Sequence, residues 1–201
     1  MLKVQRGISL VESLLVLLLG STLLTIVIGL YVTTASTGIK IIETSRLRSN
    51  LQAINTLMVN DLRRAGYGGD EYLVGVNKHK LIDLINTEKQ DCIVYAYKHS
   101  GTVTENYMGF RLNQTTHEIQ FGTNTDSSAI NCYKEGKWLA ISKSEFMKVT
   151  ELDFTEIQSS NSNEDGIMRK IQIRISAELT SNSQIKYSLN RFVQVRNIER
   201  H

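Results

Sequence analysis

The strongest constraint on this chain is an apolar run from Ile8 to Val32 that contains one ionisable side chain, Glu12. No further charged residue follows until Lys40. A helix over 8–32, rising about 1.5 Å per residue, is long enough to cross a hydrocarbon core of roughly 30 Å. The run therefore predicts a transmembrane helix. A carboxylate in such a helix costs about 2.5–3.5 kcal/mol at the bilayer centre and less near its edge, so we expect Glu12 to need a partner.

A short basic leader precedes the run: Lys3 and Arg6 come before Gly7, and the chain continues Ile8-Ser9-Leu10-Val11-Glu12. This segment resembles the processing site of the type IV pilin family, which includes the pseudopilins of type II secretion. The resemblance implies that a prepilin peptidase cuts after Gly7 and that Ile8 becomes the new, N-methylated terminus. The family usually has Phe where this chain has Ile8.

The resemblance also implies an assembly role for Glu12. In the family, the glutamate near the new terminus is thought to meet the N-terminal amine of a neighbouring subunit, which sets the docking register. Two unpaired charges in apolar surroundings cost several kcal/mol, and pairing recovers much of that cost. An alternative from the residues alone is a capping box between Ser9 and Glu12. Both roles can operate at different stages.

The residues after Val32 predict that the helix continues in amphipathic form. Apolar side chains recur there with a period of 3.6 residues, at Leu47, Leu51, Ile54, Met58, Leu62 and Ala65. We expect an opposite, polar face formed by Arg46, Arg48, Asn50, Asn55 and Asn60. The run Arg63-Arg64-Ala65-Gly66-Tyr67 predicts the helix end, with Gly66 in the left-handed conformation. That run also resembles the end of the first helix in PilW-type minor pilins.

The remainder predicts strands and polar loops. Expected strands cover 91–97, 107–112, 117–121, 138–141, 152–157, 170–179 and 185–195, and Arg191 falls in the apolar register of the last. Alternation with period two indicates an antiparallel sheet with one buried face. We therefore expect an α+β, pilin-like fold in which a long N-terminal helix packs on the sheet. The expected divisions are a leader over 1–7, a helix over 8–65 and a β-rich periplasmic or extracellular domain over 66–201.

Two cysteines, Cys92 and Cys132, bear on the compartment. Outside the inner membrane the environment is oxidising, which favours a disulfide between them. Closing a loop of about 40 residues would stabilise the fold by roughly 4 kcal/mol in the chain-entropy model. The alternative is a pair of buried, unpaired thiols.

Other patterns indicate binding sites only weakly. Asn161, Asn163, Asp165 and Gly166 have partial calcium-loop spacing, but Gln172 stands where the loop needs Glu, so a hairpin loop is the better interpretation. Seven Lys or Arg residues lie between Arg169 and the C-terminus. They suit a solvated strand face better than nucleic acid, because no aromatic interleaving accompanies them. Four isolated histidines indicate no metal site, and we expect neither a cofactor nor enzymatic activity.

These features together predict a minor pilin of a type IV pilus, part of the tip or priming complex that initiates assembly for motility, adhesion or DNA uptake. The resemblance implies the following partners: prepilin peptidase, other minor pilins, the major pilin, an inner-membrane assembly platform and a tip adhesin. The precursor would span the inner membrane once, with a cytoplasmic N-terminus and a periplasmic domain, and later enter the filament or its tip. The alternatives are a minor pseudopilin of type II secretion and an unprocessed, membrane-tethered binding module.

Overall fold

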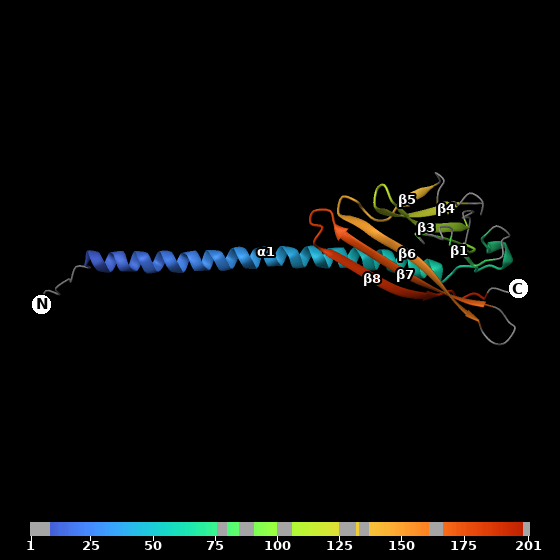
Figure 1. Cartoon of the computed structure of the whole chain (residues 1–201), viewed down its shortest axis with the longest axis horizontal. Helices are drawn as coiled ribbons and strands as arrows, with labels where there is room; N and C mark the ends of the chain where they lie inside the picture. Colours follow the sequence, from blue (N-terminus) through green and yellow to red (C-terminus); the bar gives the residue numbers. More distant parts are fainter. Residues whose placement is uncertain are drawn as a thin grey trace. The chain divides into compact units, whose positions relative to one another are not determined.

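The computed structural model describes residues 9–75, 80–84, 91–99, 106–124, 132, 137–160 and 167–198, with the backbone alone for 158–160. The chain divides into two compact units, an N-terminal unit, Met1–Glu43, and a C-terminal unit, Thr44–His201. Helix α1 (Leu10–Leu62) begins in the first unit and ends in the second. Figure 1 labels the elements along the chain.

The part of α1 inside the C-terminal unit packs through the predicted apolar stripe. Its side chains lie in the main core: Leu47, Leu51, Ile54, Met58 and Leu62, followed by Ala65 in the turn after the helix. The predicted polar face was wrong at Asn55, which is 6% exposed. Asn55 follows Leu51 by four residues and precedes Met58 by three, so it flanks the buried stripe instead of opposing it.

Five strands of the C-terminal unit form one antiparallel sheet in the order β1-β2-β3-β4-β5, counted over the described residues. They are β1 (Ile82–Leu84), β2 (Cys92–Ala96), β3 (Tyr107–Asn113), β4 (Glu118–Asn124) and β5 (Trp138–Ala140). The four strands after β1 lie where alternation and β-branched or aromatic residues predict them. The short β1 was not predicted, nor was the 3₁₀ helix η1 (Asp70–Tyr72).

Three longer strands form the second antiparallel sheet of the described chain, in the order β6-β7-β8. They are β6 (Met147–Ser160), β7 (Ile167–Leu179) and β8 (Lys186–Gln194). The β6–β7 register shifts between Val149 and Glu151, where Thr150 is the extra residue of a bulge. A bond from the Val149 amide to the His117 carbonyl (3.0 Å) connects this sheet to the region of β4.

The helix stripe and the inward faces of both sheets form one hydrophobic core, which includes Phe110 and Ile119 of the first sheet and Phe154 and Ile173 of the second. Figure 1 shows the C-terminal end of α1 beside the strands of the second sheet. The second sheet buries the face that period-two alternation makes apolar, whereas β2 of the first sheet is buried at every position. The helix stripe packs in the core that the two sheets share. This arrangement is the α+β, pilin-like fold that the sequence predicts.

The end of α1 is fastened by backbone bonds. Gly66 has a φ of 75°, the left-handed conformation expected there. Its amide donates to the Ala96 carbonyl at 2.7 Å, and the Asn197 side-chain amide donates to the Ala65 carbonyl at 2.6 Å. The turn after the helix is thus bonded to β2 and to the segment that follows β8.

Candidate functional site: an exposed apolar helix

The first functional feature is the apolar surface of α1 in the N-terminal unit. Between Leu10 and Val32 every large apolar side chain is 54–76% exposed. In the described part of the chain, α1 is the helix that is long and apolar enough to cross a membrane. A surface of this size must be covered by lipid or by other helices, since soluble monomers rarely expose contiguous apolar patches beyond a few hundred Å².

The hydroxyl groups within this surface bond to the helix itself. Ser21, Thr22 and Thr25 donate to carbonyls three or four residues earlier, at 2.8–2.9 Å. Thr33 and Thr34 do the same toward Gly29 and Leu30. In an apolar environment an unsatisfied polar group costs several kcal/mol, so these internal bonds suit the helix to lipid or to a helical bundle.

The structure places Glu12, exposed, in the first turn of α1. The Ser13 amide donates to the Ser9 carbonyl at 3.1 Å and closes that turn. The helix macrodipole favours a carboxylate at this end. Ser9 lies just before the helix and Glu12 in its first turn, while Gly7 and Ile8, the expected cleavage and methylation positions, lie outside the described residues.

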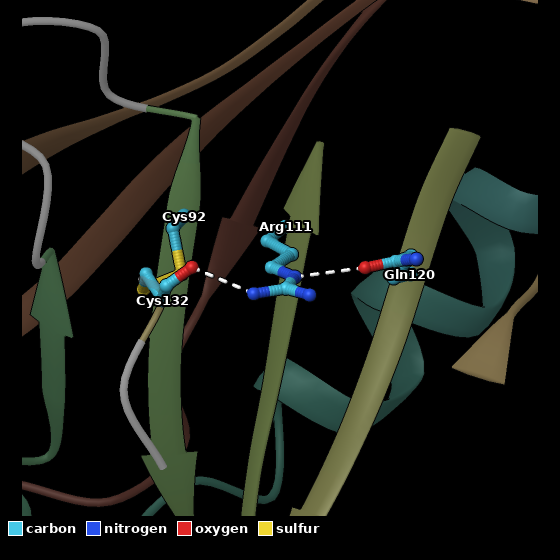
Figure 2. The surroundings of a disulfide bond; sticks show 4 residues. All are labelled: Cys92, Arg111, Gln120 and Cys132. Atoms are coloured by element: carbon cyan, nitrogen blue, oxygen red, sulfur yellow. Dashed lines mark hydrogen bonds between the residues drawn. A yellow bond between two sulfur atoms is a disulfide. The ribbon is translucent and has the colours of Figure 1, made fainter. Parts of the chain in front are cut away.

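A second feature is the disulfide between Cys92 and Cys132 in the C-terminal unit, with Cα atoms 6.2 Å apart. Cys92 is fully buried on β2, and Cys132 is 9% exposed. Figure 2 shows the bridge beside Arg111 of β3 and Gln120 of β4. The Arg111 guanidinium donates to the Cys132 carbonyl and to the Gln120 side chain, both at 2.8 Å.

Arg111 also lies over the indole ring of Trp138, 4.3 Å from its centroid. Its partial burial lowers the pKa of the guanidinium, which nevertheless stays charged. Trp138 occupies the space beside Gly122, where an added Cβ would come within 2.8 Å of the ring. The disulfide to β2 and the hydrogen bond from Arg111 of β3 thus hold Cys132 in place, and sequence spacing did not reveal the contacts of Arg111 with Cys132, Gln120 and Trp138.

The last turn of α1 and the turn that follows it contact β2 and the residue after that strand. The Asp61 carboxylate accepts hydrogen bonds from the Tyr95 hydroxyl (3.1 Å) and the Tyr97 hydroxyl (3.4 Å). The Arg64 guanidinium lies 5.7 Å from the centroid of the Tyr97 ring. Burial, and secondarily the Asp61 charge, raises the pKa of Tyr95 well above its ordinary value. Arg64 therefore contacts the Tyr97 ring as well as solvent at the end of the helix.

Three of the six C-terminal basic residues that the structure describes have acidic neighbours. Arg169 pairs with Glu156, Arg174 lies 3.7 Å from both Glu151 and Asp153, and Lys186 lies 3.2 Å from Glu178. Arg174 and Lys186 thus form ion pairs at exposed positions of a strand face, and Arg169 forms one that is buried. The possible calcium loop at 161–166 lies outside the described residues, and within them no group of three or more His, Cys, Asp or Glu could hold a metal ion.

Comparison with known proteins agrees with these features. The family model for prepilin peptidase-dependent protein B matches residues 40–195. The solved structure of a type IV-like pilin from Thermus thermophilus has a TM-score of 0.55 to this chain at 12% sequence identity, covering 77% of this chain and 99% of that one. At that identity the likeness concerns the fold alone. No curated protein sequence matches the chain.

Proposed function

Because this chain belongs to the family of prepilin peptidase-dependent protein B, we propose that it is a minor pilin of a type IV pilus, a structural subunit of the complex that primes assembly at the tip. The observation that carries the proposal is the exposed apolar helix from Leu10 to Val32 on a pilin-like fold. The processing motif at Gly7 and Ile8 precedes the residues that the family model matches. It is therefore an independent, sequence-level support.

The physical chemistry of the helix restricts where the subunit can reside. Placing apolar side chains such as Leu14 and Val32 in lipid costs little free energy, whereas exposing each one to water costs about 1.5–3 kcal/mol. Leaving the membrane is therefore favourable only when neighbouring helices cover this surface at once. Within lipid the helices gain little from association except close packing and polar contacts, so assembly needs a specific contact that fixes the register.

Glu12 and the amine formed at Ile8 would supply that contact. A carboxylate on one helix and an ammonium on its neighbour are each costly in apolar surroundings and attract each other strongly there. In this scheme the subunit waits in the inner membrane with a cytoplasmic N-terminus and its C-terminal unit in the periplasm. After cleavage and methylation it joins other minor pilins, the major pilin and a tip adhesin at the assembly platform.

Mass spectrometry of the mature N-terminus tests the proposal. In cells that contain the peptidase we expect a chain that begins at Ile8 and carries one added methyl group. Gly7→Val should leave the full-length chain, because the side chain blocks the cleavage position, and cells without the peptidase should do the same. Lys3→Gln serves as a matched leader control and should be processed. A wild-type mature chain that still begins at Met1 would identify an unprocessed tethered protein and refute the proposal.

A further inference from the structure

A groove of about 500 Å³ lies on the C-terminal unit between α1 and the end of β8. Its helix wall is one face of α1 and the residue after the helix, and its strand wall is on β8. The lining residues are Gln52, Asn55, Thr56, Val59, Asn60, Arg63, Arg191 and Phe192. The span from Gln52 to Arg63 corresponds to about 16 Å along a helix axis. That length matches roughly five residues of extended polypeptide.

Asn55 gives this groove an unused hydrogen-bond acceptor. The residue is 6% exposed, and its Oδ1 atom has no hydrogen-bond partner among the described residues. A buried polar atom left without a partner costs about 1–3 kcal/mol. Leu would fill the same flank of the helix stripe without that cost, so the unpartnered amide marks this wall of the groove as a place for a ligand that supplies a donor.

Arg191 is the second polar residue at an otherwise apolar position between α1 and β8. It occupies the inward register of β8, between the buried residues Leu189 and Val193, but is itself exposed because it faces the groove. Across the groove lies Arg63. Among the described residues neither guanidinium has a carboxylate within ion-pair distance, in contrast to Arg169, Arg174 and Lys186. The groove therefore carries two guanidinium groups without an acidic partner among the described residues.

Phe192 adds an apolar element and a strand edge. It is 50% exposed and packs against the Lys170 ammonium, 4.6 Å from its ring centroid. In the described sheet β8 pairs only with β7, so its other edge borders the groove. An edge strand beside an amide-lined groove can accept the backbone of an extended chain.

We propose that this groove binds an extended acidic segment of a partner polypeptide. A carboxylate lies between the Arg63 and Arg191 guanidiniums, a backbone amide donates to Asn55 Oδ1, and an apolar side chain covers Phe192. Nucleic acid fits less well, because affinity for DNA grows with the number of phosphates neutralised and this groove offers two guanidinium groups. The assignment does not depend on how the N-terminus is processed.

Fluorescence anisotropy with the full chain in neutral detergent micelles tests the inference. The probes are a labelled five-residue peptide alternating Asp or Glu with Val, its Asn and Gln counterpart, and a labelled DNA duplex. We expect the acidic peptide to bind at least tenfold more tightly than the amide peptide, and added salt to weaken its binding. Equal binding of the two peptides, or tighter binding of the duplex, would overturn the inference.

Three variants localise the binding. Arg191→Gln and Arg63→Gln should each weaken acidic-peptide binding by about tenfold, as expected for a lost charge-assisted bond. Lys148→Gln, which removes an exposed cation from β6, should leave it unchanged. Asn55→Leu should weaken binding while leaving the thermal midpoint equal or higher, since a merely structural amide would lower that midpoint. Unchanged affinity in both arginine variants would show that the groove is not the binding site.

Discussion

At the scale of single residues, Asp61 provides a polar attachment between α1 and the first sheet. Its carboxylate accepts bonds from Tyr95, which is fully buried, and from Tyr97, which is 4% exposed as a whole residue. Both tyrosines have raised pKa values, and burial is the main cause in each case. The folded state therefore favours the neutral phenols beside the Asp61 charge.

This cluster predicts that stability falls in alkaline solution. A phenol whose pKa is raised by folding contributes stability fully below its unfolded pKa of about 10, and that contribution is lost as the pH rises toward the folded value. Tyr95→Phe should lower the free energy of unfolding near neutral pH by about 1–2 kcal/mol, through the lost bond to Asp61. The substitution should also reduce the loss of unfolding free energy at alkaline pH. The loss that remains is due to Tyr97.

Denaturant titrations monitored by circular dichroism at neutral pH and above pH 10 measure both effects. Tyr67→Phe is the matched control, because Tyr67 is 62% exposed and follows the same turn. An unfolding free energy that depends on alkaline pH equally in wild type and Tyr95→Phe would contradict the role given to burial of Tyr95.

At the scale of elements, the disulfide and a row of aromatic side chains across β2, β3 and β4 stabilise the first sheet. The bridge spans 40 residues of sequence and joins Cys92 of β2 to Cys132. Phe110 of β3 lies between Tyr95 and Phe121, with ring centroids 5.9 Å and 5.2 Å away. Such cross-strand aromatic contacts stabilise the central strands, while short β5 depends on its neighbours.

Removing the bridge should therefore destabilise this sheet in particular. Replacing both Cys92 and Cys132 by Ala should lower the unfolding free energy by up to about 4 kcal/mol in the chain-entropy model. Trp138, the one tryptophan of the chain, lies in β5 and reports the change by fluorescence. Reducing agent should destabilise the wild type to the same degree and leave the double variant unaffected. Equal stability of the oxidised wild type and the double variant would contradict this role.

At the scale of the whole molecule, the two units have different requirements for their surroundings. The C-terminal unit buries its own core, whereas the part of α1 in the N-terminal unit buries none of its large apolar side chains. The stability of the C-terminal unit is therefore a property of the chain alone. The state of the apolar helix in the N-terminal unit is set by lipid or partner helices, and we propose that Glu12 selects those partners.

A test of that selection is Glu12→Ala. We expect normal cleavage after Gly7 and normal folding of the C-terminal unit, but at least a tenfold loss of surface pili, since an uncompensated buried ammonium costs several kcal/mol. Glu43→Ala is the matched control, because Glu43 lies on the same helix beyond the apolar run. Electron microscopy of cells gives the pilus count. Unchanged piliation with impaired protein secretion would instead favour a secretion pseudopilus.

Local sequence patterns predicted much of this architecture. The stripe from Leu47 to Ala65, the left-handed Gly66 and the alternation of Ile171, Ile173 and Ile175 with polar residues each depend on neighbours a few positions away. Such patterns follow from helix and strand periodicity, which operate before any tertiary contact forms. The three-residue strand β1 was not predicted, because so short a segment carries no period and lacks the aromatic residue that marks the equally short β5.

The sequence by itself therefore determined the apolar helix with its single acid, the alternating strands and the preference for an oxidised cysteine pair. Only the tertiary structure decided that Asn55 is buried, that Arg191 faces a groove, and that Asp61 meets Tyr95 across a separation of 34 residues. The physical reason is that periodicity assigns a side chain to a face of its own element. Which charges and amides become neighbours depends on how separate elements pack, and no local pattern contains that information.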